Sequence, residues 1–339
     1  MNNQSFILST LVLFMINSVF AQNNTSFKEL LLTKYNFKEY IIPLENDSIY
    51  FYLHKKKGSE PKNLVLYLQG TSPIPEPFFN IEKKEKGYAY MQYIPTDYNL
   101  LDENYAYAII SYVGTPAFKN DGPPNMKKYH QFNSLDYRVF QADTTINYIT
   151  EKLIKKMNKV IVYGHSEGAF VAPKLATVNK RITHLGVWGG SALPDFFDFI
   201  LFERKANLRG VQSDSLTQKN INETIKLFQL VAKDSSNTLP SNKNEITEYT
   251  NKRWWSYAEP TINHLLKIDI PIYIQLGTED ESSPIESNYL IPLEFARLGK
   301  KNLSFNVCVK CDHGFTKRNG DKEVDMWSDI FINFIKWTN

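Results

Sequence analysis

Residues 159–176 read KVIVYGHSEGAFVAPKLA, and this stretch decides the fold. The apolar run KVIVY predicts a buried strand that stops at Gly164, and AFVAPKLA predicts a helix that begins at Gly168. Between them lies the pattern Gly-x-Ser-x-Gly, centred on Ser166. A nucleophilic serine needs a sharp strand-to-helix turn, and glycines two residues to either side let the backbones approach closely. We therefore interpret Ser166 as a nucleophile rather than as a serine in an ordinary tight turn.

Strand-like and helix-like patterns alternate around this motif, which predicts an α/β fold with a mostly parallel central sheet and helices on both faces. An opening hairpin at 39–54 precedes the other expected strands, which are 63–69, 105–112, 182–188, 270–276 and 303–309. The expected helices are 134–156, 285–298 and about 323–337. About 80 residues separate Trp188 from Ile270, far more than a crossover needs, so we expect a helical lid inserted at about 193–264.

A serine nucleophile needs a base, and three histidines follow Ser166 in the chain. His184 lies inside an expected strand, and His264 lies in a helical pattern that we assign to the lid or a helix surface. His313 follows the last expected strand in the loop Cys-Asp-His-Gly-Phe, where a glycine lets the backbone turn the imidazole toward the serine. His313 is therefore the predicted base.

The acid should follow the strand at 270–276, where Gly-Thr-Glu-Asp-Glu begins. A short aspartate on this loop suits the task of orienting an imidazole, so we choose Asp280, with Glu279 as the alternative. Asp312 is disfavoured because it neighbours the histidine. Two backbone N–H groups should hold the oxyanion: that of Glu167, directly after the nucleophile, and that of Thr71, after the strand at 63–69.

The order LYLQGTSP, GHSEG, PIYIQLGTEDESSP and DHGF resembles the α/β-hydrolase superfamily, and within it the exported esterase and prolyl-oligopeptidase-like branches. The similarity runs from about Val65 to the C-terminus, apart from the lid. It implies that Ser166, Asp280 and His313 are nucleophile, acid and base, and that neither a metal nor an organic cofactor is needed. Where many members have a His-Gly pair after the oxyanion strand, this chain has Gln-Gly.

The N-terminal residues indicate the cellular location, and the composition excludes some classes of protein. Residues 6–20 read FILSTLVLFMINSVF, small or β-branched residues occupy the cleavage positions Val19 and Ala21, and a polar QNN follows, as in a secretory signal at residues 1–21. This run is shorter than a membrane span, which needs about 20 apolar residues. A hydrophobic fraction of 42% excludes a disordered chain, and a net charge of +3 gives no reason to expect nucleic acid. We expect export, with a mature chain of residues 22–339.

Three further features leave alternatives open. Cys308 and Cys311 form either a local disulfide or two free thiols. An aromatic cluster in the expected lid lines a substrate pocket or forms the core of the lid: Trp254, Trp255 and Tyr257. On the helix before the nucleophile, Arg138 and Asp143 are expected to form a surface pair. The side chains of His165 and Glu167 have no predicted role.

Together these features predict an exported serine hydrolase that cleaves carboxylic esters through an acyl-enzyme. Its expected partners are a small-molecule ester or a short peptide, without nucleic acid or stable membrane insertion. A first alternative is a peptidase or aminopeptidase of the same fold, with an acidic lid residue to bind an amine. Candidates for that residue are Glu203, Glu223, Glu245, Glu248 and Glu259. A second alternative is a binding protein that uses a hydrolase fold without catalysis.

Overall fold

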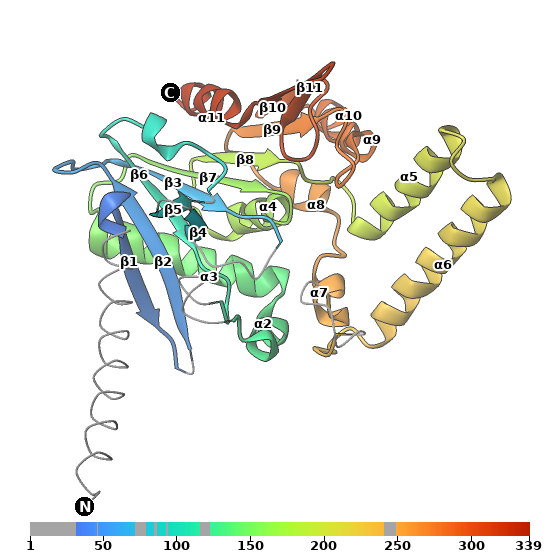
Figure 1. The fold of residues 1–339 in the computed structure, drawn as a ribbon, viewed down its shortest axis with the longest axis horizontal. Coiled ribbons are helices and arrows are strands. Elements are labelled where there is room, and N and C mark those ends of the chain that lie inside the picture. Colours follow the sequence, from blue (N-terminus) through green and yellow to red (C-terminus); the bar gives the residue numbers. More distant parts are fainter. Residues whose placement is uncertain are drawn as a thin grey trace, which may run out of the picture.

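The computed structural model describes residues 32–45, 47–71, 79–84, 87–92, 94–115, 123–240 and 249–339, so the expected signal peptide lies outside the described residues. Its central sheet has eight strands in the order β1-β2-β6-β3-β7-β8-β9-β10 (Figure 1). Only the pairings β1–β2 and β2–β6 are antiparallel, and the other neighbours are parallel. Their bounds are β1 Phe37–Pro43, β2 Ser48–Lys55, β3 Asn63–Leu68, β6 Tyr105–Ile110, β7 Lys159–His165, β8 His184–Trp188, β9 Ile272–Gly277 and β10 Leu303–Cys308.

The two faces of this sheet bury different side chains. Because successive strand residues point to opposite faces, Leu64 and Leu66 lie in an aliphatic core, while Val65 and Tyr67 lie in an aromatic one. The aliphatic face is covered by α3 (Leu135–Tyr148), α4 (Gly168–Val178), α8 (Thr261–Leu265) and α10 (Leu290–Arg297), and the aromatic face by α11 (Trp327–Trp337). The prediction of helices on both faces is confirmed.

The expected helix at 285–298 is two helices, α9 (Ile285–Asn288) and α10. Pro292 explains the break, because proline has no N–H to donate to the carbonyl of Asn288 and its ring crowds that carbonyl. Other short elements flank the core: η1 (Tyr98–Leu100), α2 (Met126–Phe132) and the π-helical turn η3 (Ile149–Leu153) that ends α3.

Two hairpins were not expected from the sequence: β4 (Phe79–Lys84) with β5 (Gly87–Gln92), and β11 (Thr316–Asn319) with β12 (Lys322–Asp325). The second corrects two expectations, because the strand at 303–309 is not the last one and the closing helix begins at Trp327 rather than near 323. Its turn is Gly320-Asp321, and Gly320 has a φ of +60°. A glycine at the first position of a two-residue loop is a hairpin signal.

Helices α5 (Asp195–Leu208), α6 (Asp214–Lys233) and α7 (Asn251–Ser256) connect β8 to α8. In Figure 1, α5 and α6 extend from one edge of the sheet as a pair, and α7 returns toward it. By contrast, α8 packs on α4 within the aliphatic core. His264 is therefore buried, which corrects its expected place on a lid or a helix surface. Among the described residues, no helix combines the length and the apolar character needed to cross a bilayer.

Candidate active site

The turn from β7 to α4 requires the residues that the motif supplies. A Cβ on Gly164 would lie 2.0 Å from the carbonyl oxygen of Gly168, and a Cβ on Gly168 would lie 1.9 Å from that of Leu68. Only glycine fits at either position. Ser166 itself has a φ of +56°, which is rare for a residue with a side chain, and its N–H donates to the carbonyl of Trp188 at 3.0 Å. These contacts are those of a strained strand-to-helix elbow.

Asp280 and His313 are joined directly. The loop after β9 carries Asp280, which is 2% exposed, and the loop between β10 and β11 carries His313. His313 Nδ1–H donates to Asp280 Oδ2 at 2.8 Å, while Asp280 Oδ1 accepts the N–H groups of Ser282 and Ser283, each at 2.7 Å. The carboxylate is thereby fixed, and Nε2 of His313 is left to act as a base.

The competing candidates have other positions. Glu279 is exposed, and Asp312 accepts the N–H of Thr316 at 2.9 Å. His184, the first residue of β8, contacts the hydroxyl of Thr183, and the other candidate histidine, His264, faces the carboxylate of Glu259. Among the candidate acids and bases that the structure describes, Asp280 and His313 are in contact with each other.

The elbow and the histidine lie at the same end of the sheet. The Ser166 N–H donates to the carbonyl of Trp188. The next residue is Gly189, and a Cβ there would lie 3.5 Å from Cε1 of His313. Within the described residues, no hydrogen bond joins the hydroxyl of Ser166 to His313. Such contacts are often loose in a free enzyme and tighten when substrate binds.

His165 has a position that the sequence did not assign. Its Nε2–H donates to the backbone carbonyl of His313 at 2.9 Å, and the two rings lie 4.8 Å apart. Burial, reinforced by the neighbouring imidazole, lowers the pKa of His165 to about 3, so its ring is neutral at neutral pH. A neutral, buried His165 therefore fixes the backbone of the loop that carries His313.

Both expected oxyanion residues lie beside Ser166. Thr71, Glu167 and Ser166 line one pocket, and the N–H groups of Thr71 and Glu167 have no hydrogen-bond partner in the described part of the chain. A Cβ on Gly70 would lie 3.0 Å from Cβ of Ser166, so a glycine lets the segment after β3 approach the elbow. Two free N–H groups next to a nucleophile can bind a developing oxyanion.

This pocket has a volume of about 170 Å³, and the insertion supplies much of its wall. Its lining outside the elbow and Thr71 is Phe170, Asp195, Asp198, Phe199, Tyr249, Arg253, Trp254, Ser282 and Ser283. Of the aromatic residues expected to line it, Trp254 does. Trp255 is 43% exposed and does not line the pocket. Tyr257 is 1% exposed and also does not line it; its hydroxyl donates to Glu167. Neighbouring positions on a helix are about 100° apart, so Trp254 and Trp255 cannot share one face.

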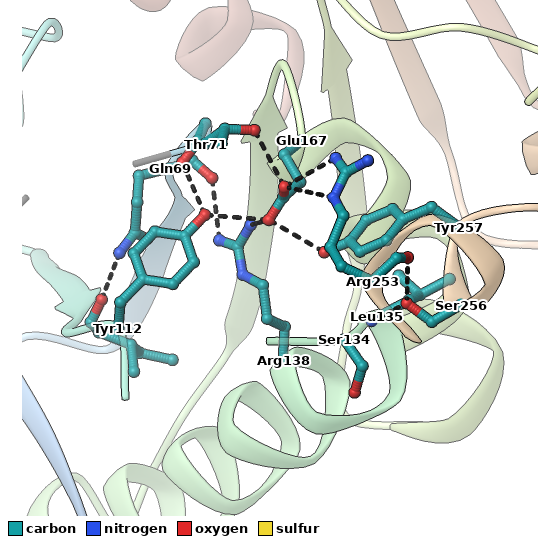
Figure 2. Close-up of polar contacts among 12 residues, drawn as sticks. Gln69, Thr71, Tyr112, Ser134, Leu135, Arg138, Glu167, Arg253, Ser256 and Tyr257 are labelled. Atoms are coloured by element: carbon teal, nitrogen blue, oxygen red, sulfur yellow. Dashed lines mark hydrogen bonds and ion pairs between the residues drawn. The ribbon is translucent and has the colours of Figure 1, made fainter. Parts of the chain in front are cut away.

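Beneath the pocket, the side chain of Glu167 is at the centre of a buried polar cluster (Figure 2). We define the Glu167 cluster as Thr71, Tyr112, Arg138, Glu167, Arg253 and Tyr257. Arg138 Nη1 lies 2.8 Å from Oε1, and Arg253 Nη2 lies 2.8 Å from Oε2. Burial acts to raise the pKa of Glu167, but Arg253 and Arg138 outweigh it and lower that pKa to about 2.

Arg138 corrects an expectation, since it is 6% exposed rather than part of a surface pair with Asp143. Asp143 instead accepts hydrogen bonds from the amides of Asn147 and Asn179. The signal was present in the sequence: position 138 falls on the buried stripe of α3, three residues after Leu135. A charged residue on an apolar stripe needs a buried partner, and the glutamate of the elbow is that partner.

The insertion also places two carboxyl groups at the pocket, both from α5. Asp195 Oδ2 accepts from Arg253 Nη1 at 2.9 Å. Asp198 is 3% exposed and accepts from the Ser191 hydroxyl at 3.0 Å. Burial raises the pKa of Asp198 to about 8, with Asp195 adding to the effect. Asp198 has no cationic partner among the described residues.

The glutamates considered as amine ligands that the structure describes, Glu203, Glu223 and Glu259, do not line the pocket. Glu203 accepts from Gln212 and Asn220, and Glu259 faces His264. Glu223 lies on α6, away from the pocket lining. The remaining two, at positions 245 and 248, lie outside the described residues.

Cys308 and Cys311 are joined as a disulfide, with their Cα atoms 5.4 Å apart. On a straight strand, residues three apart point to opposite faces, but here β10 ends at Cys308 and the chain turns at Lys310, whose φ is +63°. The disulfide closes the turn that precedes His313. Among the described residues, no group of three or more His, Cys, Asp or Glu side chains is arranged to hold a metal ion.

No protein-family model and no curated protein matches this sequence. Solved structures do match the fold. Est1E from Butyrivibrio proteoclasticus superposes with a TM-score of 0.52 at 12% identity, over 88% of this chain and 97% of its own. A membrane phospholipase A described as a bacterial virulence factor gives 0.51 at 13%, over 98% of both chains. An acylaminoacyl peptidase from Pyrococcus horikoshii gives 0.50 at 12%, over 86% of this chain and 39% of its own.

The chain has the α/β-hydrolase fold. This confirms the fold that the resemblance implied. In an α/β-hydrolase the nucleophile elbow, the acid and the histidine follow one another in the chain in that order, and the elbow, Asp280 and His313 have this order here. Identities of 12–13% establish the fold alone, so the activity has to be argued from the site.

Proposed function

We propose that this protein is a serine hydrolase that cleaves carboxylic esters. The observation that carries the proposal is the Asp280–His313 contact at the end of the sheet where the elbow holds Ser166. His313 Nε2 takes the proton of the Ser166 hydroxyl as its oxygen attacks the acyl carbon. Asp280 keeps the imidazole in the required tautomer and stabilises the imidazolium.

The tetrahedral intermediate places its negative oxygen at the N–H groups of Thr71 and Glu167. As the C–O bond to the leaving group breaks, His313 returns the proton to the departing alkoxide, which leaves an ester between Ser166 and the acyl group. Water, activated by His313, then attacks this acyl-enzyme and releases the acid. Apolar walls from Phe170 and Phe199 beside the nucleophile suit a short acyl chain.

A fluorophosphonate probe and a series of p-nitrophenyl esters test the proposal on the chain from residue 22 onward. We expect the probe to label Ser166, short acyl esters to turn over, and Ser166→Ala to abolish both. Labelling without ester turnover would direct attention to amide substrates. Absence of labelling in the wild-type chain would contradict the mechanism and favour a binding protein built on this fold.

Asp198 favours a second candidate, a hydrolase whose acyl group carries an amine. A substrate ammonium would give this buried carboxyl group the cationic partner that the described residues do not supply. Alanine p-nitroanilide and its N-acetylated form separate the two candidates. Preference for the free amine, lost in Asp198→Asn, supports the second; equal rates would show that Asp198 does not select a substrate amine.

We also propose export, with residues 1–21 removed as a signal peptide. The support is the apolar run that ends in small residues and a disulfide at Cys308–Cys311, a bond that persists in oxidising compartments. N-terminal sequencing of the protein from the periplasm or medium of an expressing bacterium is expected to begin at Gln22. A protein retained in the cytoplasm with Met1 intact would contradict export.

A further inference from the structure

The Glu167 cluster joins three parts of the site: the elbow, the segment after β3, and the insertion. Six polar contacts converge on one carboxylate. Oε1 receives Arg138, Tyr112 and Tyr257, and Oε2 receives Thr71 and two nitrogens of Arg253 (Figure 2). This many partners would be unusual for a carboxylate whose only task is to neutralise one arginine.

The contacts reach Gln69, Gly70 and Thr71, the described residues that follow β3. Arg138 Nη2 donates to the carbonyl of Gln69 at 2.9 Å, and the Tyr112 hydroxyl lies 2.7 Å from the carbonyl of Gly70. The Thr71 hydroxyl donates to Glu167 Oε2 at 2.9 Å. The segment that carries one proposed oxyanion donor is therefore tied to the residue that carries the other.

The same carboxylate reaches the insertion. Arg253 of α7 donates to Glu167 through Nε and Nη2 and to Asp195 of α5 through Nη1. Its guanidinium also lies 4.4 Å from the ring centre of Tyr257. The pocket wall formed by α5 and α7 thus shares its anchor with the nucleophile turn.

We propose that the carboxylate of Glu167 is a positioning residue: it holds Thr71 and the elbow at the spacing that an oxyanion requires and fixes the insertion against them. This inference rests on the proposed serine hydrolase activity. Oxyanion stabilisation depends on donors that are already in place when charge develops, because a hole that must reorganise loses most of its benefit. Loss of the anchor should therefore lower kcat more than it raises KM.

Thr71 allows the sharpest test, because Thr71→Val removes one hydroxyl with little change in shape and leaves the arginine pairs intact. We expect Thr71→Val to lower kcat for a short p-nitrophenyl ester about 10-fold with KM within about twofold. Thr71→Ser, which keeps the hydroxyl, should restore most of the loss. Glu167→Gln, which removes the charge, should lower kcat about 100-fold.

An alkylboronic acid, whose trigonal boron becomes tetrahedral when the serine oxygen adds to it, provides a readout that a purely structural role would not change. It binds covalently to a nucleophilic serine and mimics the transition state, so its Ki should rise in proportion to the loss of kcat/KM in each variant. Arg181→Gln, in an exposed ion pair remote from the cluster, is the matched control and should leave kcat, KM and Ki unchanged.

The outcomes separate the two proposals. If the wild-type chain shows neither fluorophosphonate labelling nor ester turnover, the hydrolase proposal and this inference are both wrong. An active wild type with a Thr71→Val variant that matches it in kcat and boronate affinity overturns the inference alone. Should Glu167→Gln fail to fold, the Thr71→Val and Thr71→Ser pair decides.

Discussion

Asp280 and Glu167 are both carboxylates that are 2% exposed, yet they serve different partners. Asp280 holds one imidazole, which stays partly open to solvent, and its second oxygen is held by backbone N–H groups of its own loop. Glu167 holds two guanidinium groups and three hydroxyls from four separate parts of the chain. Asp280 is therefore built to act on one neighbouring group, whereas Glu167 is built to join separate elements.

The largest expected effect concerns Asp280. Asp280→Asn keeps the shape of the side chain but presents an amide where Nδ1–H of His313 needs an acceptor. We expect kcat to fall about 10⁴-fold with little change in the free energy of unfolding. Steady-state kinetics and urea unfolding check this together. Activity within about 10-fold of wild type would show that His313 does not depend on Asp280.

Substitution of Glu167 should show the opposite balance: a smaller loss of kcat than Asp280→Asn and a larger loss in the free energy of unfolding. Glu167→Gln leaves Arg138 buried without its carboxylate, which should cost about 3–5 kcal/mol in the free energy of unfolding. Because the folded pKa is lowered from 4.5 to about 2, the charge stabilises the protein above pH 4.5, and this is lost as pH falls toward 2.

Urea unfolding of both proteins at several pH values measures this. The difference between wild type and Glu167→Gln should be constant from pH 6 to 8 and should narrow below pH 4.5. A difference under about 1 kcal/mol at pH 7 would mean that the cluster adds no net stability.

Asp198 is a third buried carboxyl group, and the sign of its effect is reversed. Its folded pKa is raised from 3.8 to about 8, so the unfolded chain loses its proton first and stability falls as pH rises from about 4 to 8. Asp198→Asn cannot ionise and should be more stable than wild type by about 1–3 kcal/mol at pH 8. Thermal or urea unfolding at pH 5 and pH 8 checks this prediction. A stability gain of Asp198→Asn over wild type that is no larger at pH 8 than at pH 5 would contradict it.

The sequence predicted the site where local chemistry demands particular residues. Gly164 and Gly168 stand where backbone contacts exclude any side chain, Ser166 lies between them in the motif, and His313 follows from chain order. The Asp280–His313 contact was predictable because the acid leaves the end of a strand, where parallel strands bring loops together.

The Glu167 cluster could not be predicted in the same way, because its members are distant in the chain and meet only after folding. Arg138 was detectable as a charge on an apolar helix stripe, but nothing in the sequence named its partner. Arg253 and Asp195 depend on how the insertion returns to the sheet, which periodicity does not specify. The turn at Gly320 and the break before Pro292 were readable locally and were missed.

The smallest expected effect is at the exposed pair Arg181–Glu151, where the side chains are 45% and 53% exposed. The distance of 2.6 Å is as short as any contact to Glu167, so distance alone would predict a similar contribution. In water, however, both charges are solvated before and after they pair, and the gain is offset by side-chain ordering. Arg181→Gln should therefore change the free energy of unfolding by less than about 0.5 kcal/mol at 0.15 M salt. Urea unfolding at low and high salt measures this change in free energy. A loss of stability near that of Glu167→Gln would show that burial does not explain the difference between Glu151 and Glu167.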